Sequence, residues 1–388
     1  MTGLLEDDKQ RSVIRDRVAA IASKYGQKYF VERSLDHGGI DELWRELGSA
    51  GILGLSLPEE YGGGGLGLSE FAVVLEELAA HGMPMLNVVI SPAICGSIIA
   101  AHGSPEMKAA WLPGLADGSK QMAFAITEPG AGSNSHQVET VSRRDGDGWV
   151  ISGGKYFISN ADRADAVLVV TRDGDHDSAV SGRNPLSLFV VPTSAEGFER
   201  ERLETSVISP WWQFTLLFGD VRVGPDALIG EAGKGLRQVF AGLNPERILA
   251  AGISNGIGRR AIQQASGYAK DRQVWSTPIG AHQGVSHPLA EAHIGVELAR
   301  LATARAAELF DSGADAGEAA NIAKFAAAEA SLKALDQAIQ VHGGNGLSKE
   351  YGLSDLWFAA RMLRTAPVSR EMVLNFVAQT SLGLPRSY

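Results

Sequence analysis

The sequence predicts a mainly α-helical protein with an all-β domain inserted in the middle of the chain, and two observations lead to this. Residues 8–122 and 232–388 carry apolar residues at the three- and four-residue spacing of amphipathic helices. Residues 123–231 instead carry short β-rich runs separated by turns. We therefore expect an N-terminal helical domain (1–122), a small β-barrel-like middle domain (123–231) and a C-terminal four-helix bundle (232–388).

The composition excludes several classes of function. A chain of 388 residues can bury a large core, and its excess of 45 acidic over 35 basic residues argues against a nucleic-acid-binding surface. The single cysteine, Cys95, rules out an internal disulfide and a cysteine-based metal cluster, and we expect it to be a small buried residue. The charged first residues hold no signal-peptide core, and no run of about 18 apolar residues occurs. We expect a cytoplasmic protein with no metal site and no nucleic-acid or membrane partner.

The N-terminal domain is expected to contain several helices around a glycine-rich loop. The loop spans 58–67 and holds four consecutive glycines. The helix after it, over 68–80, places four apolar residues on one stripe: Phe71, Val74, Leu75 and Leu78. Its three glutamates are expected on the solvated face: Glu70, Glu76 and Glu77.

In the middle domain, four runs read as strands: 149–152, 166–171, 186–191 and 214–223. The polar segment 175–184 between two of them is expected to be an exposed loop. Three aromatic residues near the end of the domain, Trp211, Trp212 and Phe214, are interpreted as core packing. A cap over a ligand, or a docking surface, is the alternative.

The C-terminal domain shows helical spacing in three long, alanine-rich segments. Their broad apolar faces favour a bundle, and such faces often continue into contacts between subunits. The residues that mark them are Ile248, Leu249, Ile253 and Ile257; Leu289, Ile294, Leu298 and Leu301; and Ile322, Phe325, Leu332, Leu335 and Ile339.

Residues 122–133, Met-Ala-Phe-Ala-Ile-Thr-Glu-Pro-Gly-Ala-Gly-Ser, form a motif around which the chain is organised. A strand-like start runs into a turn with one proline, two glycines and two hydroxyls. A rigid loop with free N–H groups suits a flat or phosphate-bearing ligand. It is neither a P-loop nor a Rossmann fingerprint, because the lysine of the one and the third glycine of the other are missing. An ordinary β-turn is the alternative.

Four further motifs elsewhere in the chain help to interpret this loop. Residues 153–160, Gly-Gly-Lys-Tyr-Phe-Ile-Ser-Asn, follow a strand pattern. Leu-Pro-Glu-Glu-Tyr-Gly-Gly occurs at 57–63, Tyr-Ala-Lys-Asp-Arg at 268–272 and Gln-Val-His-Gly-Gly-Asn-Gly at 340–346. In this order and spacing the five motifs resemble those of the acyl-CoA dehydrogenase family, over nearly the whole chain.

The resemblance implies an FAD site. In the family, residues that match the first loop line the flavin ring and the dinucleotide arm, and those that match 157–159 lie over the other part of the ring. Phe157 stands where tryptophan is frequent, and Ser159 where threonine is. The residues implied are Phe124, Ile126, Thr127, Gly132, Ser133, Phe157, Ile158, Ser159 and, near the C-terminus, Ser369.

The resemblance also implies that two subunits share each FAD. Arg272 matches an arginine that reaches the pyrophosphate of a neighbouring subunit's FAD, and Gln283 a glutamine near the adenosine half. Gln340, Gly343 and Gly344 match the segment that receives the partner's dinucleotide. The chain is then at least a dimer, and the family is usually a tetramer, a dimer of dimers. A helix C-cap is the local alternative for the glycines.

The family removes the Cα proton of an acyl-CoA thioester with a glutamate base. Where most members carry this glutamate in the C-terminal segment, this chain has Pro367. A minority, including isovaleryl- and long-chain-type enzymes, supply it from an earlier helix, and Glu246 matches that position. Asn244 and Arg247 beside it, with Ser133, are then expected to bind substrate. A plain helix start, with Asn244 as N-cap and Pro245 at the first position, is the alternative.

Pro367 raises a second question, because the family's backbone N–H at this position helps to hold the thioester oxygen, and proline has none. Either Val368 donates instead, or the oxyanion site is weaker, or the reaction differs. Glu371 is an alternative base.

Three readings follow. The first is an FAD-dependent acyl-CoA dehydrogenase that passes electrons to an electron-transfer flavoprotein. The others are a flavin monooxygenase or nitrogen oxidase of the same fold, and a non-catalytic acyl-CoA-binding homologue.

Overall fold

The computed structural model describes residues 8–36, 38–174 and 185–386. The charged first residues, 1–7, and the predicted loop at 175–184 lie outside the described residues. Across the described ranges, no helix combines the length and apolar character needed to cross a lipid bilayer.

The N-terminal domain is helical, as predicted. Its helices are α1 (Lys9–Leu35), α2 (Asp41–Ser49), α3 (Leu68–Ala80), α4 (Leu86–Val88), α5 (Ser97–His102) and α6 (Pro105–Asp117), with a π-helical segment η2 (Val89–Gly96) between α4 and α5. Local chemistry explains the helix starts. The Asp8 carboxylate accepts the Arg11 N–H at 2.9 Å, and Ser104 precedes a proline at the first position of α6. The predicted stripe of α3 is fully buried.

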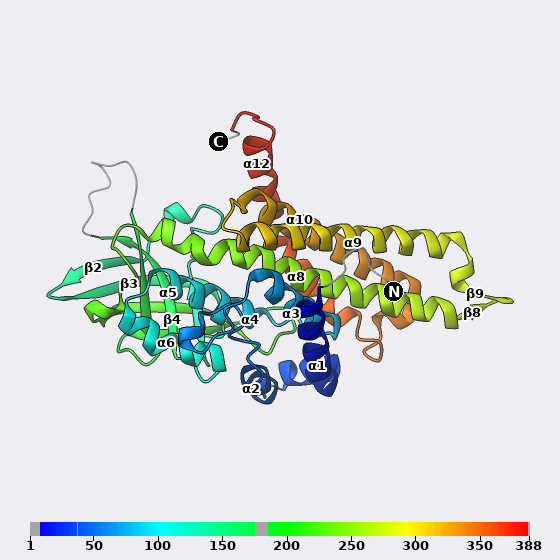
Figure 1. The fold of residues 1–388 in the computed structure, drawn as a ribbon, viewed down its shortest axis with the longest axis horizontal. Helices are drawn as coiled ribbons and strands as arrows, with labels where there is room; N and C mark the ends of the chain where they lie inside the picture. Colours follow the sequence, from blue (N-terminus) through cyan, green and yellow to red (C-terminus); the bar gives the residue numbers. More distant parts are fainter. Residues whose placement is uncertain (1–7, 37, 175–184, 387–388) are drawn as a thin grey trace.

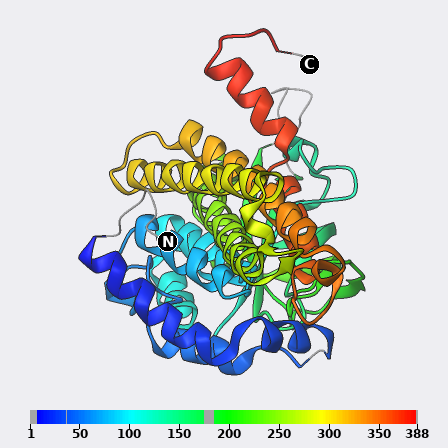
Figure 2. The ribbon, with the colours of Figure 1, turned by 90° about the vertical axis from the view of Figure 1, so that its right-hand side faces the viewer.

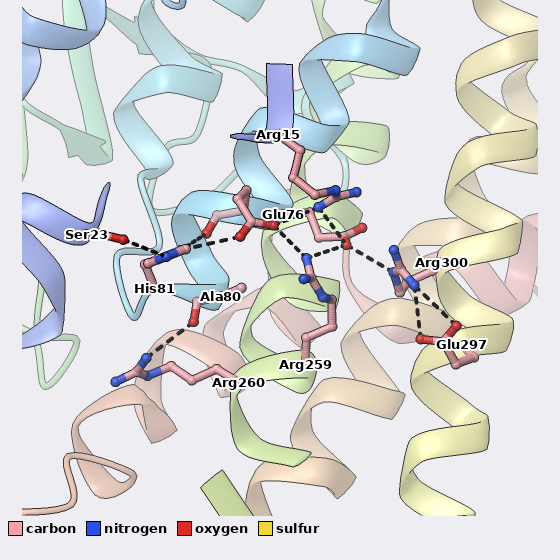
Figure 3. A network of polar contacts seen from close by, with 10 residues as sticks. Arg15, Ser23, Glu76, Ala80, His81, Arg259, Arg260, Glu297 and Arg300 are labelled. Carbon is pink, nitrogen blue, oxygen red and sulfur yellow. Dashed lines mark hydrogen bonds and ion pairs between the residues drawn. The ribbon is translucent and has the colours of Figure 1, made fainter. Parts of the chain in front are cut away.

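The prediction of a solvated face for Glu76 and Glu77 is wrong. Both are about 95 % buried, and they lie in an ion-pair network between α1, α3, α8 (Gly235–Asp271) and α9 (Gln283–Asp311) (Figure 3). Three arginines hold Glu76, at 3.4 Å, 2.7 Å and 3.0 Å: Arg15, Arg259 and Arg300. The carboxylates are buried because the paired charges compensate for the lost water.

The middle domain forms, within the described residues, one seven-stranded curled sheet in the order β1-β4-β2-β3-β7-β6, with β5 also paired to β4. The full length of β4 pairs with β5, whereas β1 and β2 share its other edge. The expected barrel-like domain is thus confirmed only in part, as a curled sheet. The strands are β1 (Met122–Ala125), β2 (Val141–Asp145), β3 (Gly148–Ser159), β4 (Ala166–Asp173), β5 (Leu186–Pro192), β6 (Phe198–Leu203) and β7 (Gln213–Val223).

Core packing is confirmed for the aromatic residues at the end of this domain. Trp211 is buried, and its ring meets Phe30 and Trp44 edge-on, with centroids 6.3 Å and 6.2 Å apart. The Arg202 guanidinium lies over Trp212, 3.7 Å from its centroid. The Trp211 contacts join the middle domain to α1 and α2, whereas the Arg202–Trp212 contact stays within the domain.

Three long helices dominate the C-terminal domain and run side by side along the molecule: α8 (Gly235–Asp271), α9 (Gln283–Asp311) and α10 (Gly317–His342) (Figure 1). A fourth, α11 (Trp357–Thr365), is short, and α12 (Arg370–Thr380) projects from the body (Figure 2). The expected bundle is thus confirmed only in part. The sheet domain lies at one end of the long axis, and the β8–β9 hairpin (Gln273–Val274, Thr277–Pro278) at the other (Figure 1).

Glycine allows α8 to approach the N-terminal domain closely. A Cβ at Gly242 would lie 2.8 Å from Ile94 of η2, and one at Gly256 only 2.2 Å from the Glu76 carbonyl of α3. The first contact brings the early turns of α8 against η2, beside β1.

Candidate active site

The two flavin-type motifs lie side by side at the edge of the sheet domain. The Tyr156 N–H in β3 donates to the Thr127 carbonyl at 2.8 Å. The Phe157 ring is half exposed, and its φ of 59° turns it out of the regular strand. No atom lies within 4 Å of the Cβ positions of Gly130 and Gly132, so the loop face is open. An aromatic wall beside an open, N–H-bearing loop fits a flat ligand with a phosphate arm.

The residues predicted to contact the flavin differ in how exposed their side chains are. Gly132 and Ser133 are exposed on the open loop, whereas Phe124, Ile126 and Thr127 are half-buried. Ile158 and Ser159 are buried, with Ile158 in the sheet core and the Ser159 hydroxyl accepting from Gln213 at 2.8 Å. The Ile158 side chain therefore supports the wall from behind.

A buried ion pair beneath the loop was not predicted. The Lys155 ammonium donates to the Glu128 carboxylate at 2.7 Å and to the Ile126 carbonyl at 3.1 Å. Glu128 also accepts the backbone N–H groups of Glu139 and Thr140, at 2.6 Å and 3.0 Å. Both residues stand inside the quoted motifs, but the sequence did not indicate that they pair. Lys155 thus joins β3 to the loop from below.

Burial and pairing shift the pKa values of Lys155 and Glu128 in opposite directions. Burial lowers the pKa of Lys155 to about 8, although Glu128 opposes this. Burial would raise the pKa of Glu128, but Lys155 and the N–H donors outweigh it and hold that pKa below its usual value. Glu128 is therefore ionised at neutral pH.

Glu246 lies inside α8, eleven residues after the helix begins at Gly235. The alternative that Asn244 and Pro245 start a helix is therefore wrong, because Pro245 is an interior residue. The Arg247 guanidinium donates to the Asn244 side-chain oxygen at 2.8 Å, across one helical turn. The position of Glu246 thus needs another explanation than helix capping.

Glu246 is largely surrounded by protein but remains partly accessible. Part of its surface stays accessible, yet burial raises its pKa to about 7, against the opposing charges of Arg247 and Lys324. The neighbouring Cys95 is fully buried, and Glu246 adds to the burial that raises the pKa of its thiol. That thiol donates to the Ala123 carbonyl of β1 at 3.6 Å. A carboxylate with a pKa near neutrality suits proton abstraction.

The connection from α11 to α12, residues 366–369, reaches the same region. The Lys324 ammonium, from α10, interacts with Glu246 and donates to the Val368 carbonyl. Ser369 caps α12, its hydroxyl accepting the Met372 N–H at 3.2 Å. Glu371 has 73 % of its side chain exposed on α12, which disfavours it as a buried base. Lys324 is a site residue that the sequence analysis missed. Its only signal was a lysine within an apolar, alanine-rich stretch of the helix, at 322–328.

The remaining predicted residues lie at the opposite end of the molecule (Figure 1). Arg272 caps α8 just before the β8–β9 hairpin, and Gln283 begins α9. The Tyr268 ring stacks on His342, with centroids 4.2 Å apart, and so brings the end of α10 beside the end of α8. All five predicted residues here are exposed: Arg272, Gln283, Gln340, Gly343 and Gly344. Gly343 is also the C-cap of α10, with a φ of 59°.

Three stretches of the chain match one family in order. Residues 8–119, 123–218 and 233–382 match the N-terminal, middle and C-terminal domains of acyl-CoA dehydrogenases. The chain belongs to the acyl-CoA dehydrogenase family. It is therefore an enzyme of a flavoprotein family whose cofactor is FAD, and the open loop beside Phe157 fits that cofactor.

Relatives across the family agree with this. Acyl-CoA dehydrogenase FadE12 of Mycobacterium tuberculosis is 55 % identical over 384 residues, 98 % of each chain. The short-chain specific acyl-CoA dehydrogenase of Homo sapiens is 34 % identical over 310 residues, 79 % of this chain and 74 % of that one.

Solved structures of the family share the fold. A glutaryl-coenzyme A dehydrogenase, solved as its glutaryl-CoA complex, superposes with a TM-score of 0.92 at 27 % identity over 99 % of this chain and 98 % of that one. Butyryl-CoA dehydrogenase from Megasphaera elsdenii gives 0.91 at 26 % identity, covering 97 % and 99 %.

Proposed function

We propose that this acyl-CoA dehydrogenase oxidises an acyl-CoA thioester to the trans-2-enoyl-CoA, with Glu246 as the base that removes the Cα proton. The observation that carries the proposal is the placement of Glu246 on α8, beside Cys95, which bonds to the strand leading into the flavin-type loop. Its raised pKa suits a base that works near neutral pH. Its partly exposed surface leaves access for a substrate.

The chain's own groups would divide the work as follows. The Glu246 carboxylate takes the Cα proton while Arg247 and Lys324 limit the rise of its pKa. Phe157 and the loop at 126–133 form the wall and arm site for FAD, which supplies the acceptor for the hydrogen and two electrons that leave Cβ. The thioester oxygen needs a donor, and Pro367 offers no N–H, so we assign that role to the adjoining residues of the 366–369 connection.

The test compares two glutamates. In Glu246→Gln, anaerobic bleaching of the bound flavin by a panel of acyl-CoA thioesters should slow at least 100-fold, the lower range for a lost general base, while FAD stays bound. Glu371→Gln, an exposed glutamate in the neighbouring segment, is the matched control and should bleach normally. Normal bleaching of Glu246→Gln removes it as base. Flavin that is bleached by a separate reductant but by no acyl-CoA, and is then reoxidised by oxygen with formation of an oxygenated product, would indicate a monooxygenase instead.

We also propose a homotetramer, a dimer of dimers, with each FAD shared by two chains and its electrons passed to an electron-transfer flavoprotein. The loop at 126–133 and the group around Arg272 lie at opposite ends of one chain (Figure 1), so a single dinucleotide reaches both only across an interface. Apolar side chains on the outer helices support such contacts: Ile294, Leu298 and Ile322 are each more than 40 % exposed.

A further inference from the structure

Lys324 is a buried cation in a place where α10 is otherwise apolar. Only 2 % of its surface is exposed, and its neighbours Ala320, Ala323, Ala327 and Ala328 are buried as well. A buried lysine is costly unless its ammonium finds partners. Here the partners are the carbonyl oxygens of Arg364, at 3.3 Å, and of Val368. A single ammonium therefore holds both ends of the connection between α11 and α12.

Pro367 lies between these two carbonyls and cannot donate a hydrogen bond of its own. The tie through Lys324 is reinforced further along α10, where the Glu329 carboxylate accepts from Arg364 at 2.6 Å and from Arg370 at 3.1 Å. Glu329 is about one-third exposed, whereas the Lys324 tie is buried. The connection is therefore held to α10 from its inner side by Lys324 and from its outer side by Glu329.

Lys324 also faces the helix that carries Glu246. The charged groups around Lys324 are Arg247 and Glu246 on α8, Glu329 on its own helix and Glu371 on α12. Around Glu246 they are Arg247 and Lys324, with the Cys95 thiol from η2. Among the described residues, Lys324 is thus the cation that acts on Glu246 from another helix, and the same ammonium holds the neighbouring connection.

We propose that Lys324 is a positioning residue for Glu246: its ammonium holds the Arg364 and Val368 carbonyls, and so keeps the 366–369 connection next to the base, while its charge favours the ionised Glu246 carboxylate. The inference rests on the proposed function, because it concerns the same base. It adds that the base and the connection opposite it are coupled through one side chain on α10.

The expected effects have a clear sign. Loss of the positive charge disfavours the Glu246 carboxylate, so the pH above which the base is ionised rises, by about one unit for a close charge partner. Loss of the two carbonyl bonds loosens the connection and raises KM for acyl-CoA. A residue that served stability alone would lower the melting temperature but leave the pH profile in place.

The experiment uses the full-length holoprotein with Lys324→Gln, which keeps one donor but no charge, and Lys324→Met, which fills the apolar space. Anaerobic flavin reduction by an acyl-CoA is followed against pH, with FAD content and melting temperature measured in parallel. Both variants should move the acid limb upward by about one pH unit. Lys324→Arg keeps the positive charge, so its acid limb should lie at the wild-type pH. Lys333→Gln, an exposed lysine on the same helix, is the control and should keep the limb.

Two results would overturn the inference: an unchanged acid limb in the folded glutamine or methionine variant, or a shifted limb that is shifted equally in Lys324→Arg. Both are distinct from failure of the proposed function, which would appear as normal flavin reduction in Glu246→Gln whatever Lys324 does.

Discussion

The Lys155 ammonium lies 2.7 Å from the Glu128 carboxylate, with both side chains buried beneath the loop at 126–133 that we propose contacts FAD. Lys155 also holds the Ile126 carbonyl, and Glu128 holds the N–H groups of Glu139 and Thr140. The pair therefore connects β1, β2 and β3 at the point where the loop leaves the sheet. These contacts fix the shape of the loop at 126–133, which is the proposed FAD site.

We predict that Glu128→Gln both destabilises the protein and weakens FAD retention. Removing one partner of a buried pair leaves an uncompensated charge and costs about 3 kcal/mol. Urea unfolding and the flavin-to-protein absorbance ratio after gel filtration measure the two effects. Glu139→Gln is the control, because only the backbone of that residue contributes to the pair. A stable Glu128→Gln with full FAD content would contradict the prediction.

The raised pKa of Glu246 predicts an acid limb in catalysis. Burial raises this pKa to about 7 from the usual 4.5, so the base is protonated below that pH. We expect kcat/KM to fall about tenfold per unit below pH 7, measured by stopped-flow flavin reduction. The effect on stability has the opposite sense: this group's contribution is fully present below pH 4.5 and is lost as the pH rises through 7. A flat rate profile from pH 5 to 8 would exclude Glu246 as the titrating base.

The network around Glu76 predicts a second stability effect. Glu76→Gln removes the charge that three arginines share and should lower the free energy of unfolding by about 3 kcal/mol. Thermal melting measures it, and the surface pair variant Glu291→Gln should melt close to the wild type. Because no residue of these ion pairs belongs to the loop at 126–133, we expect FAD content to be unaffected. Equal melting of the two variants would show that the network contributes little.

For the distant group of residues we predict that Arg272→Ala weakens both FAD retention and assembly. Arg272 is exposed in one chain and offers a planar fork suited to a pyrophosphate. Flavin content and sedimentation velocity are the measurements. Arg305→Ala, at an exposed arginine on α9 that pairs with Glu308, should change neither. A holo-oligomer of Arg272→Ala indistinguishable from wild type would argue against the shared site.

Local patterns predicted most of the elements. The stripe of α3 and the long C-terminal helices follow from helical periodicity, and the strands at 166–171 and 186–191 from their β-rich runs. The strands β2 and β6 were missed because their charged, exposed residues, such as those from Glu199 to Arg202, lack an apolar signal.

Pairings between distant segments could not be predicted in this way. Glu76 and Glu77 look like solvated residues in sequence, since the arginines that bury Glu76 stand 61, 183 and 224 residues away. Asn244-Pro245 imitates a helix start, and that alternative is wrong because α8 begins at Gly235 and tolerates Pro245 in its interior. Lys324 was missed for a similar reason: only the fold brings it to the carbonyls beyond α11.

The loop at 126–133 and the group around Arg272, both proposed to contact FAD, lie far apart along the molecule, and this has a consequence for how the enzyme responds to dilution. On the shared arrangement proposed above, every chain donates half of one cofactor cavity and borrows half of another. FAD occupancy and subunit association are then linked by mass action, so free FAD would stabilise the oligomer. At a low concentration of free FAD, the oligomer would dissociate before any protomer unfolds.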